Sequence, residues 1–169
     1  SEGVNVFLHG SLPAIGIDPD VDSFTVKMTG GPDGDVGGNF IRIAHETYGD
    51  RIKIIGIADG SGSGEDPQGL NLRELLRLFE AELPIAEYDP SKLSNEGRIV
   101  TLDDPDGPIL RNTLHNRLVA DAFVPCGGRP AAMNESNWDD FLTASGTPSS
   151  RLIVAVSYTH LRAHETSKH

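Results

Sequence analysis

The 169-residue sequence has one cysteine, no long apolar run and few basic residues. The single thiol, Cys126, excludes an internal disulfide and fits a reducing cytosol. No apolar run approaches the roughly 18 residues that a membrane-spanning helix needs, and residues 1–18 lack the basic start and apolar block of a signal peptide. Lys and Arg number 14 against 25 Asp and Glu, which disfavours nucleic acid and anionic membranes as partners. We therefore expect a cytoplasmic protein that binds neither nucleic acid nor a membrane.

The stretch FTVKMTGGPDGDVGG at residues 24–38 carries the strongest signal in the chain. Apolar and polar residues alternate in its first half, which predicts a strand, and a helical apolar pattern follows its end. Between them Gly31, Gly34 and Gly37 recur at three-residue spacing. Glycines let a backbone turn tightly beside a phosphate, and the new helix directs free N–H groups and its positive dipole end at the anion. The pattern predicts a nucleotide-binding turn, although glycine-rich turns also occur in ordinary loops.

A second apolar run, RIKIIGIA at residues 51–58, predicts another strand, and Asp59 follows it directly. Asp59 lies 22 residues after Gly37, close to the separation at which a carboxylate at the end of the second strand accepts from the ribose hydroxyls of a dinucleotide. The same carboxylate would repel a 2′-phosphate, which favours NAD over NADP. The alternative is that Asp59 is a turn residue of the Asp-Gly-Ser-Gly sequence.

The remaining pattern alternates strands and helices, which predicts right-handed crossovers and a mainly parallel sheet. Asn71 followed by Glu74 predicts the start of a helix, and Gly49 the end of the helix before it. Residues 60–70 are polar and glycine-rich, and we expect a loop there. The other expected elements are helices at residues 2–12, 109–120 and 136–144 and strands at residues 98–102, 122–124 and 152–154.

Four segments together carry a family resemblance: KMTGGPDGDVGGN, GIADGSGSGEDPQGL, RNTLHNRLVADAFVPCGGRP and SSRLIV. They resemble the large bacterial NAD-specific glutamate dehydrogenases, in order and over about residues 1–154. The resemblance implies a Rossmann-like α/β fold for residues 1–155, with a mainly parallel sheet flanked by helices and truncated at its C-terminal end. It implies that the chain is a fragment, the dinucleotide-binding domain of a longer enzyme.

The resemblance also implies which residues meet the cofactor, NAD. The pyrophosphate lies on the backbone of the glycine turn, formed by Gly31, Gly34, Asp35, Val36 and Gly37. The adenosine ribose lies at Asp59 and Gly60. The turn of Pro125, Cys126 and Gly127 lies near the ribose or nicotinamide side. No histidine stands near Cys126 in the sequence, so a nucleophilic thiol is disfavoured.

The family reaction is oxidative deamination of L-glutamate to 2-oxoglutarate and ammonia, with hydride passed to NAD. Its catalytic lysines and aspartate lie outside this chain, so no catalytic residue is assigned and the fragment alone is expected to be inactive. L-glutamate would bind through the missing domains, and the full-length protein is expected to be a homo-oligomer. Two alternatives remain: the same domain of another amino-acid dehydrogenase, or a non-catalytic nucleotide-binding regulatory module.

The last residues follow a different pattern. The segment VSYTHLRAHET at residues 156–166 resembles a translated sequencing adapter, and we expect residues 156–169 to be a non-native tail. His160 and His164 have the i, i+4 spacing of a zinc-binding helix. Because they fall in this tail, we expect no metal site.

Overall fold

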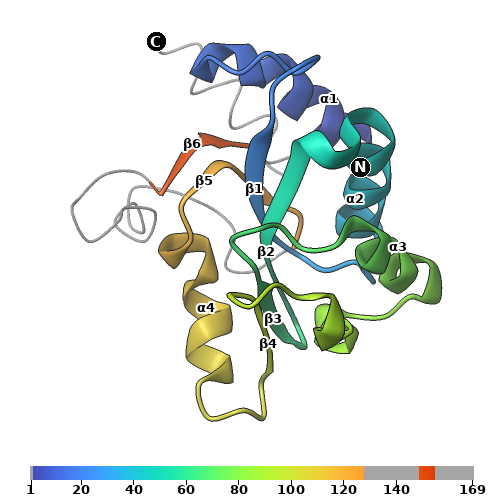
Figure 1. Ribbon diagram of the computed structural model, residues 1–169, viewed down its shortest axis with the longest axis vertical. Coiled ribbons are helices and arrows are strands. Elements are labelled where there is room, and N and C mark those ends of the chain that lie inside the picture. Colours follow the sequence, from blue (N-terminus) through green and yellow to red (C-terminus); the bar gives the residue numbers. More distant parts are fainter. Residues whose placement is uncertain (1, 128–148, 155–169) are drawn as a thin grey trace.

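The computed structural model describes residues 2–127 and 149–154 and contains a mixed, mainly parallel six-stranded sheet (Figure 1). The strand order is β4-β3-β2-β1-β5-β6. Strands β1, β2, β5 and β6 run parallel, whereas β3 is antiparallel to both of its neighbours. The strands are β1 (Phe24–Thr29), β2 (Ile52–Asp59), β3 (Gly62–Glu65), β4 (Arg98–Thr101), β5 (Ala120–Pro125) and β6 (Ser150–Ile153).

Helices cover both faces of this sheet. Figure 1 shows α4 on one side, and α2 and α3 on the other. The four α-helices are α1 (Glu2–Ser11), α2 (Asp35–Tyr48), α3 (Leu72–Ala81) and α4 (Gly107–Arg117). Short 3-10 turns complete the described part: Leu12–Ile15, Gly49–Arg51, Ile85–Glu87 and Pro90–Lys92. The expected Rossmann-like α/β class is therefore confirmed.

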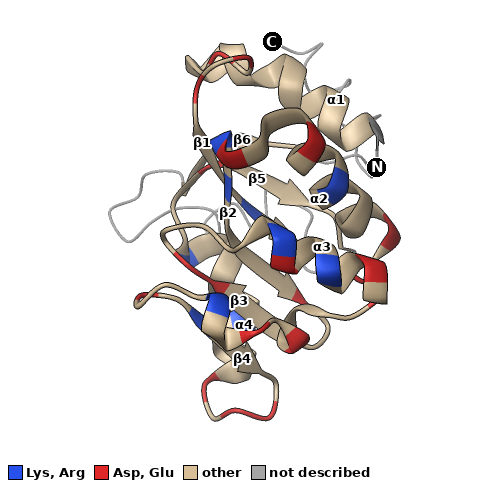
Figure 2. Ribbon diagram, turned by 45° about the vertical axis from the view of Figure 1, so that its right-hand side comes forward, with Lys and Arg blue, Asp and Glu red and all other residues tan. Residues whose placement is uncertain are grey.

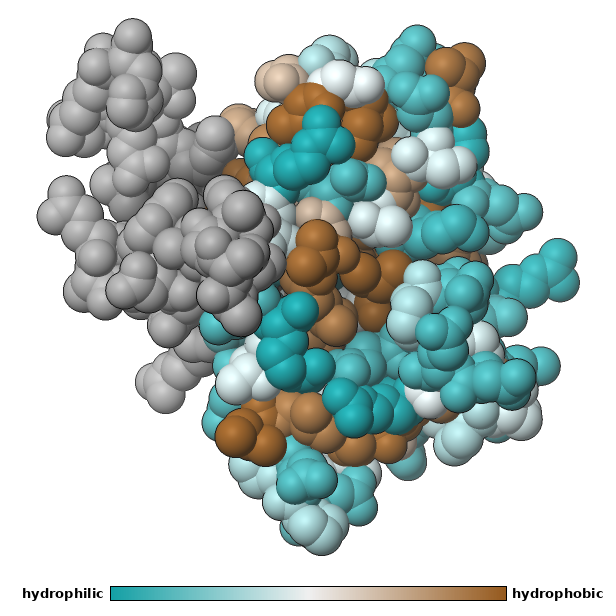
Figure 3. Space-filling model, turned by 60° about the vertical axis from the view of Figure 1, so that its left-hand side comes forward, coloured by the Kyte–Doolittle hydropathy of each residue, from teal (hydrophilic) through white to brown (hydrophobic). Residues whose placement is uncertain are grey.

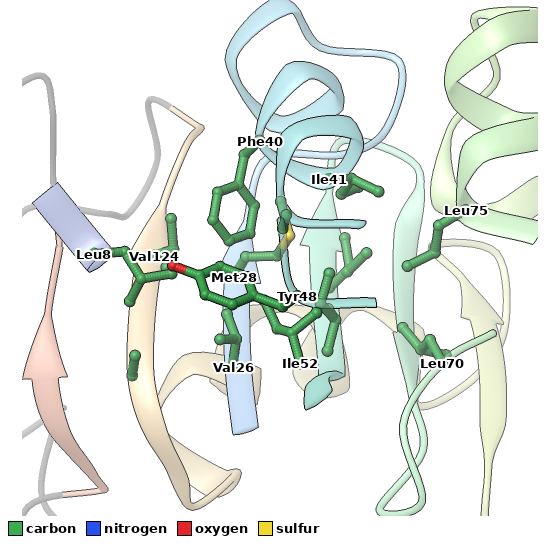
Figure 4. Packing of buried hydrophobic residues seen from close by; sticks show 14 of the residues in the cluster. Leu8, Val26, Met28, Phe40, Ile41, Tyr48, Ile52, Leu70, Leu75 and Val124 are labelled. Carbon is green, nitrogen blue, oxygen red and sulfur yellow. The ribbon is translucent and has the colours of Figure 1, made fainter. Parts of the chain in front are cut away.

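The main core lies between β1 and β2 and the helices α1, α2 and α3 (Figure 4). Val26 and Met28 of β1 point toward Phe40 of α2, and all three side chains are fully buried. Tyr48, at the end of α2, packs edge-on against Phe24 with ring centroids 5.0 Å apart. Burying side chains of this size contributes about 1.5–3 kcal/mol each. This packing fixes the strand that carries the glycine turn against the helix that follows it.

The other face of β1 is buried, whereas the alternation of apolar and polar residues predicts that it is exposed. Lys27 and Thr29 point to the α4 side, yet both are buried. The Lys27 Nζ donates to the carbonyl of Leu118 at 2.7 Å, and to the carbonyl and hydroxyl oxygens of Ser149 at 3.1 and 2.7 Å. Leu118 is the C-cap residue of α4, so the ammonium stands where a helix end favours a positive charge. Both faces of β1 are covered because helices pack on both sides of a parallel sheet.

Strand β3 is a second difference. The expectation of a loop at residues 60–70 is wrong for Gly62–Glu65, which pairs with both β2 and β4. Gly64 packs beneath Ile85 and Ile99, where a Cβ would lie 2.6 Å from the Ile99 side chain. Glycine has a low propensity for strands, but it fits here because this position leaves no room for a side chain.

The other local predictions are confirmed within a few residues. Helix α2 ends at Tyr48 and Gly49 adopts a positive φ of 57° after it. The Asn71 side chain caps α3 by accepting from the Glu74 amide at 3.0 Å. Helix α4 begins and ends slightly before the expected residues 109–120, and β5 extends beyond residues 122–124 at both ends. The helix expected at residues 136–144 lies outside the described residues, as does the tail at residues 156–169.

Candidate functional site

The carboxyl ends of β1 and β5 form the topological switch point of the sheet. The chain passes from β1 to β2 on one side and later returns to β5 on the other. The Thr29 carbonyl accepts from the Cys126 amide at 2.7 Å and from the Gly127 amide at 2.9 Å. A Cβ on Gly30 would lie 2.5 Å from the Gly127 nitrogen, and Gly30 has a φ of 87°. Only glycine fits this crossing, and open α/β sheets bind ligands at such a crevice.

The glycine turn leads directly into α2. The Gly34 amide donates to the Gly31 carbonyl at 3.1 Å, which closes the turn. A Cβ on Gly37 would lie 2.6 Å from the Gly31 carbonyl oxygen, so this position requires glycine for close packing. Gly34 is the N-cap residue and supplies no side-chain acceptor. Among the described residues no acceptor meets the amides of Asp35, Val36 and Gly37, which leaves a helix N-terminus open to an anion.

Carboxylates surround this turn on its α3 side. A cavity of about 650 Å³ is lined by Pro32, Asp33, Gly34, Asp35, Phe79, Glu80 and Glu82. Asp33 is exposed, and desolvation together with the nearby Asp59 charge raises the pKa of its carboxyl. The N-terminus of α2 therefore combines free amide donors with an acidic rim. Figure 2 shows Asp and Glu in red and Lys and Arg in blue along the ribbon.

Asp59 is the last residue of β2 and joins three segments. Its Oδ1 accepts from the amide and the hydroxyl of Ser61 at 2.8 and 2.6 Å. Its Oδ2 accepts from the Ile85 amide at 2.8 Å. A Cβ on Gly31 would overlap this carboxylate, which places Asp59 against the glycine turn. The contact to Ser61 agrees with the interpretation of Asp59 as a turn residue. Its carboxylate also stands beside the glycine turn with one lone pair to spare, and binding of a ribose there stays a prediction. Gly60 follows in open space.

The turn at Pro125, Cys126 and Gly127 lies at the same edge as the glycine turn because β1 and β5 are neighbours. Cys126 packs against the apolar core, and desolvation raises the pKa of its thiol to about 12. A thiol with this pKa stays protonated at neutral pH, so it is a poor nucleophile. Cys126 therefore has a packing position at the carboxyl end of β5, and its contact with a cofactor stays a prediction.

Arg111 was missed by the sequence analysis. It lies on α4, yet its Nε donates to the Asp59 carbonyl at 2.9 Å, which brings a guanidinium from the other face of the sheet to the end of β2. Its Nη1 donates to Asn112 at 2.9 Å. In the described residues no carboxylate forms an ion pair with Arg111, unlike Arg98 and Arg117, which both pair with Glu65. No local motif marks Arg111, since its place depends on how α4 crosses the sheet.

Histidines and acidic residues do not form a metal site in residues 2–127 and 149–154. His9 lies 2.8 Å from the Tyr48 hydroxyl, and His115 stacks on Phe123. These contacts give both imidazoles structural roles. None of the helices in the described ranges is long and apolar enough to cross a membrane. His160 and His164 lie outside these ranges.

Sequence comparison places this architecture among known enzymes. Residues 1–148 match the family model described as Glutamate/Leucine/Phenylalanine/Valine dehydrogenase. The chain belongs to this dehydrogenase family. It is 39% identical over 165 residues to a probable NAD-specific glutamate dehydrogenase of Schizosaccharomyces pombe, and 38% identical over 147 residues to an NAD-specific glutamate dehydrogenase of Neurospora crassa. The alignments cover 91% and 79% of this chain but only 14% and 13% of the two relatives.

Solved structures of the dehydrogenase family share the fold. Plasmodium falciparum glutamate dehydrogenase matches with a TM-score of 0.58 at 15% identity, over 90% of this chain and 28% of that one. A second glutamate dehydrogenase structure matches with a TM-score of 0.53 at 13% identity, over 97% of this chain and 32% of that one. At such low identity the likeness concerns the fold alone. The chain thus corresponds to a small part of each of these relatives and structures.

Proposed function

We propose that this chain is the NAD-binding part of a glutamate dehydrogenase that oxidatively deaminates L-glutamate to 2-oxoglutarate and ammonia. The observation that carries the proposal is the uncapped N-terminus of α2 after the glycine turn, at the switch point between β1 and β5. The curated relatives are named NAD-specific glutamate dehydrogenases, which supports both the cofactor and the substrate. The quoted motifs favour the large type found in bacteria, with this chain as a piece of it.

The residues present fit a dinucleotide. The amides of Asp35, Val36 and Gly37 would hold the pyrophosphate, since they are free and close to the turn. Asp59 would accept from the adenosine ribose with its remaining lone pair, and Gly60 leaves room beside it. The Pro125–Gly127 turn would line the nicotinamide side. When bound, NAD supplies the hydride acceptor, and the protein groups named here bind and orient it.

We propose that residues 1–155 form the dinucleotide-binding unit and that residues 156–169 play no part in it. Substrate binding and proton transfer would come from segments of a longer polypeptide, so the chain alone would not oxidise glutamate. The full enzyme would be a cytoplasmic homo-oligomer. The family also includes leucine, phenylalanine and valine dehydrogenases, so another amino acid is the second candidate substrate.

Thermal unfolding of the 169-residue chain with NAD, with NADP and without ligand tests cofactor binding. A ligand that binds only the folded state stabilises it by about 2.7 kcal/mol at a hundred times its dissociation constant. We expect NAD to raise the unfolding midpoint and NADP to raise it less. Gly37→Val is the matched control, because its side chain would meet the Gly31 carbonyl and distort the turn. An equal response of both proteins to NAD would contradict the assigned site.

A further inference from the structure

The end of β2 carries charges of both signs, although a carboxylate alone would be enough to accept hydrogen bonds from ribose hydroxyls. Asp59 lies in the sheet, and Asp33 lies on the glycine turn, where desolvation and the nearby Asp59 charge raise the pKa of the Asp33 carboxyl. Arg111 reaches the same strand end from α4 and has no carboxylate partner among the described residues. Where an arginine stands at this place in a dinucleotide fold, it accommodates the 2′-phosphate of NADP, whereas a carboxylate selects the free hydroxyl.

We propose that the cofactor preference of this chain is set by a balance, in which the carboxylates of Asp33 and Asp59 offset an Arg111 guanidinium that is already placed to bind a 2′-phosphate. The inference rests on the proposed NAD site and extends it to residues that decide between the two dinucleotides. It makes Arg111 a specificity residue and Asp33 a second discriminating carboxylate.

The geometry gives each group a separate part. Three donors, from the Ser61 amide, the Ser61 hydroxyl and the Ile85 amide, fix the Asp59 carboxylate, so its charge cannot swing away. The Asp33 side chain is exposed beside the glycine turn, where an arriving phosphate would approach. The Arg111 Nε is held by the Asp59 carbonyl at 2.9 Å, and Nη2 has no acceptor among the described residues. The Nη2 group, with two N–H donors, therefore stays available at this end of β2.

The sum of the local charges sets the relative affinity for NAD and NADP. Asp33, Asp59 and Arg111 together carry a formal charge of about −1, which repels a phosphate of charge near −2 more than an uncharged hydroxyl. Neutralising Asp33 brings the three-group sum to zero, and neutralising Arg111 makes it −2.

Charge-neutral variants test the balance. Binding of NAD and of NADP is measured by equilibrium dialysis with the 169-residue chain at low and at high salt. We expect Asp33→Asn to tighten NADP binding by about three- to tenfold and NAD binding by less, and Arg111→Gln to weaken NADP binding by a similar factor. Arg111→Lys should retain most of the NADP affinity. All these effects should shrink at high salt, because exposed charges are screened.

The controls make the same charge changes at the other end of β2. Asp50 and Arg73 line a separate cavity beside Lys53, near the start of that strand. We expect Asp50→Asn and Arg73→Gln to leave the NAD to NADP affinity ratio unchanged. Thermal unfolding of each variant checks that it is folded, and Asp33→Asn alters an exposed side chain that the fold does not need.

The outcomes separate the inference from the function on which it rests. If the unaltered chain binds neither dinucleotide, the proposed function is overturned together with the inference. If it binds NAD but neither Asp33→Asn nor Arg111→Gln moves the affinity ratio beyond the two controls, the charge balance is wrong and the NAD site stands. A ratio that moves in opposite directions in the two variants supports the balance.

Discussion

Replacing Lys27 by methionine should change how the stability of the protein depends on pH. The Lys27 side chain is fully buried, and desolvation lowers the pKa of its ammonium to about 7. In the unfolded chain a lysine keeps its ordinary pKa of about 10.4. Between these values the unfolded state binds one more proton than the folded state, so the free energy of unfolding rises with pH.

The size of the effect follows from this shift and from a second buried group. Each pH unit in that window adds about 1.36 kcal/mol, or about 2 kcal/mol from pH 7 to 8.5. Above about pH 8.5 Cys126 has the opposite effect, because it makes the free energy of unfolding fall with rising pH. Its folded pKa is raised to about 12 by desolvation, so the folded state then binds the extra proton. The two contributions cancel above that pH, and we expect the stability to level off.

Urea unfolding at half-unit steps from pH 6.5 to 9.5 measures this for the unaltered chain, Lys27→Met and Cys126→Ala. We expect the unaltered chain to gain about 2 kcal/mol and then level off, and Cys126→Ala to keep rising. Lys27→Met should lack the rise. Parallel curves for Lys27→Met and the unaltered chain would refute the reasoning. They would mean that the three acceptors around Nζ keep the ammonium charged throughout.

Three further substitutions test the site and the packing. Gly37→Val should abolish stabilisation by NAD in a thermal shift assay, because its side chain would meet the Gly31 carbonyl. Asn71→Ala should lower the free energy of unfolding by about 1 kcal/mol, since the Glu74 amide loses its cap, and urea unfolding measures it. Glu65→Gln should cost roughly 1–3 kcal/mol by the same assay, because two half-exposed guanidinium groups lose one buried carboxylate. A loss below about 0.3 kcal/mol in either stability variant would contradict the assigned contacts.

Local features of the fold could be read from the sequence. The strand at Phe24–Thr29, the glycine turn and the helix to Tyr48 follow each other without a gap, and each has its own signal in periodicity or capping. The Asn71 cap is local for the same reason. The edge at which the glycine turn, Asp59 and the Pro125–Gly127 turn come together follows from a parallel sheet, where strand ends meet.

Features that depend on distant segments could not be read in this way. The β3 strand is rich in glycine and forms because β2 and β4 lie on either side of it. Alternation predicted the orientation of Lys27 but not its burial, since the covering α4 lies more than 75 residues later. Arg111 has no motif, and its contact to the Asp59 carbonyl spans 52 residues. Sequence periodicity reports which way a residue points, whereas burial depends on what covers it.

The Lys27 contact also bears on the order in which the chain can fold during synthesis. β1 can pair with β2 and pack on α2 as soon as residue 59 has emerged. The first acceptor for the Lys27 ammonium is the Leu118 carbonyl, 91 residues after Lys27 in the sequence. The second is Ser149, 122 residues after Lys27. Leu118 comes 59 residues after Asp59, so at 5–20 residues per second β1 would wait roughly 3 to 12 s with one edge open and its lysine in water. The half of the sheet that carries the glycine turn therefore forms early, and the switch point between β1 and β5 is completed only when β5 arrives.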